Sequence, residues 1–309
     1  MTESLLLEIG CEEIPAGYIG PALEQLEGLA RKGLSEARIE YSTLRALGTP
    51  RRLSLLVTGV GERQADRLVE TYGPPGKIAF DEAGRPTKAA LGFAKSVGAP
   101  VEKLELRATP KGDYLYFALH ERGLPAREVL PGLLREWVLG LAFPKTMQWN
   151  SRGRFARPVR WLAALLGRGV LPLEAFGVTA GRRSRGHRTL APGWFDIPTP
   201  TEYVGALREH GVLVEPAARR DALAASLEGS VRARGGRAVT DPELLDEVTN
   251  LVEWPEAVPG DFDEKYLSLP RAVVVTAMRA HQRYFAVEDE AGRLLPRFLA
   301  VRNGRGEGA

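Results

Sequence analysis

An arginine-rich run near the middle of the chain has residue types and spacing suited to binding phosphate. Four arginines and a histidine fall within seven residues, namely Arg182, Arg183, Arg185, His187 and Arg188. Guanidinium groups present a planar fork of donors that fits phosphate oxygens, and the glycine inside the run lets the backbone approach closely. No acidic residue lies near the run in the sequence, so it has no local ion-pair partner. The run predicts a phosphate-binding loop, with a solvated charged loop as the alternative.

A second run combines guanidinium, amide and aromatic groups, in Arg279, His281, Gln282, Arg283 and Tyr284. Such groups can stack on an unpaired RNA base and hydrogen-bond to its edges. The alternative is packing, because aromatic residues at a helix-to-strand junction usually divide between the core and its rim. Trp149 and Trp161 are predicted to be core residues rather than stacking platforms.

Charge is segregated along the chain, although the net charge is only +3. Ten Lys/Arg residues and one acid, Glu174, lie between Lys145 and Leu190, and this basic segment includes Arg157 and Arg160. Nine acids and one lysine lie between Thr240 and Tyr266. The basic segment is therefore expected to face the backbone of an RNA. The acidic helix from Asp241 to Glu253 is expected to face a partner surface or to pack the domains together.

Catalytic and metal sites are not predicted, and no residue is assigned to either. The histidines are not paired at a metal-ligand spacing, and neither a phosphate-binding Gly-rich loop nor a nucleophile elbow is present. Cys11 lies next to Glu12 and Glu13, whose charges oppose formation of a thiolate. The two glutamates are expected to belong to a loop or a helix start rather than to an acid–base pair.

These runs must be positioned by an α+β fold with mixed or antiparallel sheets, packed helices and at least two domains. Residues 1–62 predict an N-terminal α/β unit, with a strand at Ser4–Ile9, a helix at Pro15–Arg31 and a hairpin at 43–60. Residues 63–150 predict a loop-rich α/β insertion, in which Thr87 caps a short helix that ends near Gly98. Residues 151–309 predict an α+β domain.

Within residues 151–309, the basic segment contains a predicted hairpin of Val159–Leu166 and Val170–Val178 around a glycine-rich turn, with a helix at Pro158–Leu166 as the alternative. Thr199 and Glu202 predict a capping box for a helix closed by Gly211. The remaining predicted elements are helices at Pro216–Arg234, Asp241–Pro255 and Pro270–His281, then strands at Tyr284–Val287 and Arg297–Val301.

Length and composition fit an ordinary soluble protein, with 309 residues of which 26% are charged. The longest apolar runs are far shorter than the roughly 20 residues that span a bilayer, so no membrane segment is predicted. The single cysteine cannot form an intrachain disulfide, and the acidic N-terminus differs from a secretory signal. A cytoplasmic protein is expected.

A series of motifs resembles the N-terminal part of the beta subunit of bacterial heterotetrameric glycyl-tRNA synthetases, in the order in which that family carries them. The matching blocks are Glu8–Pro15, Thr49–Leu53, Gly84–Ala90, Lys111–Leu115, Phe143–Met147, Phe155–Trp161, Arg185–Arg188, Glu247–Pro255, His281–Phe285 and Leu294–Pro296. One block alone is a weak signal, but their joint order over nearly the whole chain is specific. Cys11 and Gln148 depart from the family pattern, which usually has threonine and arginine there.

The resemblance implies a non-catalytic region of a class II glycine–tRNA ligase with two alpha and two beta chains. Its expected partners are the alpha chain and tRNA(Gly), with no membrane or DNA; ATP and Mg belong at the alpha chain, and this chain carries no cofactor. The region from 151 is similar to the editing-type module of the phenylalanyl-tRNA synthetase beta chain. Helical and anticodon-binding domains follow in the family, so the chain is expected to be truncated or unusually short. A docking module for the alpha chain with little RNA contact is the main alternative, and an editing-like hydrolase is the least favoured.

Overall fold

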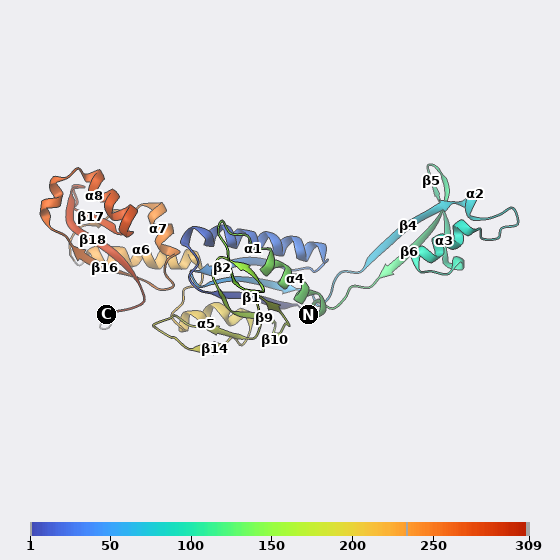
Figure 1. Ribbon diagram of the computed structural model, residues 1–309, viewed down its shortest axis with the longest axis horizontal. Helices are drawn as coiled ribbons and strands as arrows, with labels where there is room; N and C mark the ends of the chain where they lie inside the picture. Colours follow the sequence, from blue (N-terminus) through green and yellow to red (C-terminus); the bar gives the residue numbers. More distant parts are fainter. Residues whose placement is uncertain (1, 233, 307–309) are drawn as a thin grey trace. The chain divides into compact units, whose positions relative to one another are not determined.

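The computed structural model describes residues 2–232 and 234–306 and divides into two compact units (Figure 1). The first unit joins the residues up to Glu62 with those from Ala126 onward, and the second is Arg63–Pro125. Every strand pair within the named sheets is antiparallel, so the expected α+β fold is confirmed.

A five-stranded sheet forms the centre of the first unit, in the order β10-β9-β1-β3-β2. Its strands are β1 (Glu3–Cys11), β2 (Thr43–Thr49), β3 (Arg52–Val60), β9 (Val159–Leu166) and β10 (Gly169–Val170). The central strand β1 is a nearly continuous apolar run because both faces of the sheet are covered. Glu8 is the exception, since it is a buried carboxylate on this strand.

Helices cover the two faces of this sheet separately (Figure 1). Helices α1 (Ala16–Glu36) and α4 (Ala126–Gly140) pack their apolar stripes on the face that carries Leu5, Leu7 and Ile9. A 3-10 turn, Pro200–Glu202, and α5 (Tyr203–Glu209) pack on the other face. Thr199 donates to Glu202 and makes no side-chain bond to the backbone at this helix start, so the predicted capping box is wrong in its geometry.

Short hairpins carry most of the basic segment. They are β7 (Met147–Asn150) with β8 (Gly153–Phe155), β11 (Glu174–Ala175) with β12 (Val178–Thr179), and β13 (Arg183–Arg185) with β14 (Trp194–Asp196). The predicted turn at Gly167–Gly169 is confirmed, but the strand predicted to follow it is broken, and β10 holds only two residues.

The C-terminal part of the first unit is a four-stranded sheet in the order β15-β17-β18-β16, with its own core (Figure 1). The strands are β15 (Arg237–Ala238), β16 (Pro255–Asp261), β17 (Phe285–Glu288) and β18 (Leu294–Asn303). The helices are α6 (Pro216–Arg232), α7 (Pro242–Thr249) and α8 (Arg271–Ala277), with a 3-10 turn at Glu264–Ser268 and a π-helical turn at Met278–Gln282. Helix α7 ends at Thr249, so the predicted helix to Pro255 is too long; Pro255 instead opens β16.

The second unit is a three-stranded sheet in the order β4-β6-β5, packed on short helices (Figure 1). Its elements are β4 (Arg67–Pro75), α2 (Gly76–Ala79), α3 (Lys88–Val97), a 3-10 turn at Val101–Lys103, β5 (Glu105–Thr109) and β6 (Gly112–Glu121). The Thr87 side chain accepts from the Ala89 N–H, and Gly98 takes the left-handed conformation beyond the helix, which confirms both predicted ends of α3. Residues 126–150, which the sequence assigned to the insertion, instead supply α4 to the core of the first unit.

Candidate functional site

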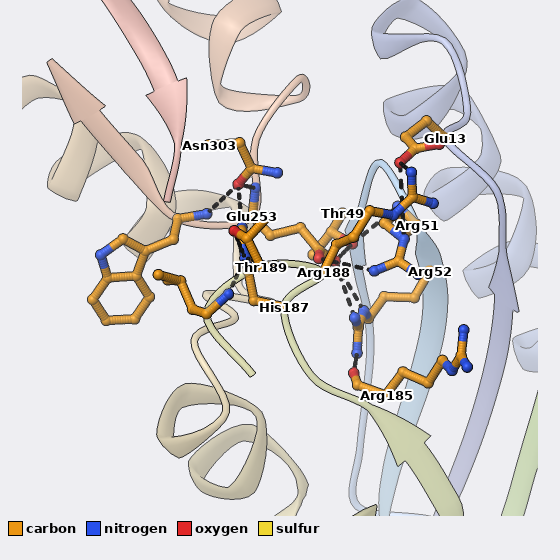
Figure 2. Close-up of polar contacts among 12 residues, drawn as sticks. Glu13, Thr49, Arg51, Arg52, Arg185, His187, Arg188, Thr189, Glu253 and Asn303 are labelled. Carbon is orange, nitrogen blue, oxygen red and sulfur yellow. Dashed lines mark hydrogen bonds and ion pairs between the residues drawn. The ribbon is translucent and has the colours of Figure 1, made fainter. Parts of the chain in front are cut away.

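The side chain of Glu253 is fully buried in a polar cluster between the two sheets of the first unit (Figure 2). Its carboxylate accepts hydrogen bonds from Thr49 Oγ1 at 2.7 Å and Arg52 Nε at 3.2 Å. Burial alone would raise the pKa of Glu253, but Arg52, the Thr49 hydroxyl and Arg51 together hold the pKa below its ordinary value. A paired, ionised carboxylate therefore joins the N-terminal sheet to the turn before β16.

Arg52 is the cation at the centre of this cluster and is also fully buried. Its Nη1 donates to Arg185 O at 2.9 Å and to Ser184 Oγ at 3.3 Å. Burial opposes the charge, yet Glu253 and Glu8 raise the pKa of Arg52 above its ordinary value. Arg52 thus ties the end of β13, within the predicted phosphate-binding run, to β3.

His187 lies beside this cluster with only 1% of its surface exposed (Figure 2). Its Nδ1 accepts from the N–H groups of Thr189 and Leu190, so Nε2 carries the hydrogen and donates to Asn303 Oδ1 at 2.7 Å. The same Asn303 oxygen accepts from the N–H groups of Glu253 and Trp254. The ring of His187 therefore holds loops together, whereas the sequence suggested contact with RNA.

Arg160 and Arg188, two residues of the basic segment that were predicted to contact RNA, form ion pairs with glutamates. Glu12 accepts from Arg160 at 2.7 Å and from Arg188 at 2.8 Å, and Arg188 also pairs with Glu13 at 2.9 Å. The hydrogen bond from Arg160, followed by that from Arg188, lowers the pKa of Glu12. The run has no ion-pair partner nearby in the sequence, as predicted, but Arg188 pairs with acids from a distant part of the chain.

The second predicted run packs against the acidic helix α7. Arg279 pairs with Asp241 and Glu243, and Arg283 pairs with Glu247 at 3.0 Å. Tyr284 stacks on Phe298, with ring centroids 4.5 Å apart and an interplanar angle of 8°. Arg279, Arg283 and Tyr284 therefore make packing contacts within the chain, and the acidic face of α7 turns toward the chain's own arginines. His281 and Gln282 remain exposed at the π-helical turn.

Another group of predicted contacts forms no ion pair within the described residues, namely Arg157, Arg182, Arg183 and Arg185. Arg182 donates to the carbonyl oxygens of Arg168 and Ile197, and Arg157 donates to that of Glu13. Arg183 and Arg185 lie over the ring of Trp194, with guanidinium carbons 5.4 Å and 4.6 Å from its centroid. Trp194 is 45% exposed and Arg183 is exposed, whereas Arg185 is half-buried, so the β13–β14 hairpin presents an indole and a cation to solvent with a second cation beside them.

Sequence reasoning did not single out Trp194 or Glu253. The register of β13 and β14 pairs Arg185 with Trp194, and a turn containing Pro192 and Gly193 between the two strands was the available signal. Glu253 had no such signal, because its partner Thr49 is 204 positions away. Trp161 is buried as predicted, whereas Trp149 is 39% exposed and that prediction is wrong.

Metal and thiol chemistry finds little support in the part of the chain that the structure describes. No group of three or more His, Cys, Asp or Glu side chains in residues 2–232 and 234–306 could hold a metal ion. Cys11 is fully buried, and burial raises the pKa of its thiol despite the nearby Arg52 and Arg51. None of the described helices is long and apolar enough to cross a bilayer.

Residues 5–309 match a family model described as glycyl-tRNA synthetase beta subunit. The chain is similar to the glycine–tRNA ligase beta subunit of Moorella thermoacetica, at 48% identity over 98% of this chain and 44% of the relative. The corresponding protein of Desulforamulus reducens is 46% identical over the same shares. That of Syntrophotalea carbinolica is 45% identical over 99% of this chain and 45% of the relative. The chain thus spans less than half the length of these relatives.

Proposed function

Because the chain belongs to the family of glycyl-tRNA synthetase beta subunits, as its motifs predicted, we propose that it is the RNA-handling, non-aminoacylating region of a glycine–tRNA ligase. In this role it supports binding of tRNA(Gly) and assembly with an alpha chain in the cytoplasm. ATP and Mg act at the alpha chain, which performs the glycylation. The region from residue 151 serves as an editing-type module that has kept a binding role.

The strongest support for this proposal is the exposed surface of the β13–β14 hairpin. Arg182, Arg183 and Arg185 have no carboxylate partner among the described residues, unlike Arg160 and Arg188. Unneutralised guanidinium groups bind phosphate oxygens, and an exposed indole stacks on bases. Trp194 offers a stacking surface for a base, and Arg183 and Arg185 offer cations for phosphate. Single-stranded RNA presents both kinds of group.

The test is tRNA binding by the complete complex with its alpha chain. We expect Arg182→Ala/Arg183→Ala/Arg185→Ala to weaken tRNA binding by about tenfold or more, since each charge-assisted hydrogen bond contributes about 1.5–3 kcal/mol. The matched control is Arg220→Ala/Arg279→Ala/Arg283→Ala, which removes the same charge from guanidinium groups paired with acids. Equal losses in both variants would show that net charge, and not this hairpin, governs binding.

A docking module for the alpha chain is the second candidate, and an apolar surface supports it. Tyr266 on the 3-10 turn, Leu269 just after it and Val273 on α8 are all exposed. Exposed apolar groups at adjacent turns fit the core of a protein interface. If Tyr266→Ala/Leu269→Ala/Val273→Ala abolishes co-elution with the alpha chain while the arginine variant keeps full tRNA affinity, docking is the main role.

A further inference from the structure

A cleft of about 510 Å³ lies beside the β7–β8 hairpin, apart from Trp194. It is lined by Pro15, Tyr18, Pro144, Lys145, Thr146, Met147, Arg154, Ala156 and Arg157. Three of these side chains are cationic, and no acidic side chain of the described residues lines the cleft. Its walls thus combine positive charge with apolar and aromatic surface.

The three cations, Lys145, Arg154 and Arg157, form no ion pair within residues 2–232 and 234–306, although acids neutralise many other arginines of the chain. Arg154 is anchored by the side chain and the carbonyl of Thr146, at 3.2 Å and 2.9 Å. Arg157 is anchored through its Nε, which donates to Glu13 O at 3.0 Å. Each guanidinium is oriented by neutral acceptors and keeps its full charge for an anion.

The aromatic wall comes from Tyr18, in the first turn of α1. Its ring packs against Phe143 with centroids 6.3 Å apart, which fixes its position next to Pro15 and Pro144. No side chain caps the start of α1 and no acid lies in its first turn, so the helix dipole adds to the positive field of the cations. Met147 is exposed at the rim and adds polarizable apolar surface.

We propose that this cleft binds one unpaired nucleotide of an RNA strand, with its phosphate on Lys145, Arg154 and Arg157 and its base against Tyr18 and Met147. A phosphate explains three unneutralised cations around one cleft, and a planar base explains the aromatic wall. The cleft is an additional contact for the RNA whose binding is proposed above, so this inference rests on that function. The hairpin β13–β14 and the cleft are separate sets of residues, and they are tested separately.

The experiment measures fluorescence anisotropy of a labelled single-stranded pentauridylate with the full-length beta chain bound to its alpha chain. We expect Lys145→Ala/Arg154→Ala/Arg157→Ala to weaken binding by about tenfold or more. We also expect it to reduce the salt slope by about 2, at roughly 0.7 for each lost cation. Lys95→Ala/Arg135→Ala/Arg208→Ala is the matched control, because these exposed cations also have no ion pair among the described residues. Tyr18→Leu should weaken binding while leaving the salt slope unchanged.

A second variant guards against misfolding of the hairpin that Arg154 braces. Lys145→Glu alters a side chain that makes no hydrogen bond in the described residues, so it should weaken oligonucleotide binding and leave folding intact; Lys95→Glu is its control. If the cleft variants and the control variants bind the oligonucleotide equally well while the complex still binds tRNA, the nucleotide site in the cleft is overturned and the proposed function stands. Failure of the parent complex to bind either RNA overturns the proposed function as well. Displacement of the oligonucleotide by AMP at equal concentration overturns the assignment to an RNA strand in favour of a free nucleotide.

Discussion

Replacing Glu253 by glutamine tests whether the buried ion pair holds the two sheets of the first unit together. Glutamine keeps an oxygen that can accept from Thr49 but removes the negative charge that faces the fully buried Arg52. Removing one partner of a buried pair costs about 3–5 kcal/mol. Glu8 still attracts Arg52, so we expect the lower end of that range, about 3 kcal/mol of unfolding free energy. Urea unfolding followed by tryptophan fluorescence measures it.

The cost of Glu253→Gln depends on pH. The pKa of Glu253 in the folded protein is lowered, so the unfolded chain binds its proton more readily. The stabilisation is therefore fully present above the ordinary carboxyl pKa, about 4.3, and is lost as the pH falls through the folded pKa. The difference between the parent and Glu253→Gln should be constant near neutral pH and shrink in acid.

Two further variants complete the test of Glu253. Glu215→Gln is the control, because its partner Arg45 lies at the surface, and it should cost less than about 1 kcal/mol. Glu8→Gln/Arg52→Met/Glu253→Leu should recover part of the loss, since it removes the buried Glu8 carboxylate, which Arg52 also neutralises, together with the ion pair. A cost for Glu253→Gln as small as that of the surface control, or a cost that grows in acid, refutes the account of this cluster.

Two other substitutions test the packing around the same cluster. Gly10→Ala should destabilise the protein by about 1–3 kcal/mol through overpacking, because an added Cβ would lie 1.8 Å from the Trp161 ring; thermal unfolding measures it, and an unchanged melting temperature would contradict the close approach. Asn303→Ala should cost about 3 kcal/mol in urea unfolding, since Asn303 Oδ1 accepts three hydrogen bonds from buried or half-buried donors. Asn303→Asp keeps the acceptor and should cost less; equal losses would argue against this role.

Helices and strands were predictable where their sequence pattern depends only on neighbouring residues. The apolar run of β1, the helix stripe of α1 and the cap at Thr87 each depend on neighbouring residues, and all three were found from the sequence. The end of α7 was missed because Leu251 and Val252 continue the apolar stripe although the backbone has already turned. Tertiary contacts set the end of this helix, because the turn after it places Glu253 against Thr49 and Arg52.

The candidate site was only partly predictable, because charge patterns in the sequence do not show which charges meet. Arg188 lies in the same run as Arg183 and Arg185, yet acids from distant parts of the chain neutralise Arg188 and not the other two. Arg283, in the second run, is likewise neutralised by Glu247. Trp194 gains its significance only from the register that sets it opposite Arg185. Pairing across the fold, rather than residue type, separates the cations that remain available for phosphate.

The most direct measurement is photo-crosslinking from position 194. A benzophenone amino acid replaces Trp194 in the full-length beta chain, and the complex with the alpha chain and tRNA is irradiated. We expect a covalent adduct between position 194 and tRNA, while the same group at Tyr266 gives no RNA adduct. Crosslinking of position 194 to the alpha chain would contradict contact between the β13–β14 hairpin and tRNA. A tRNA adduct from position 266 without one from position 194 would contradict it as well.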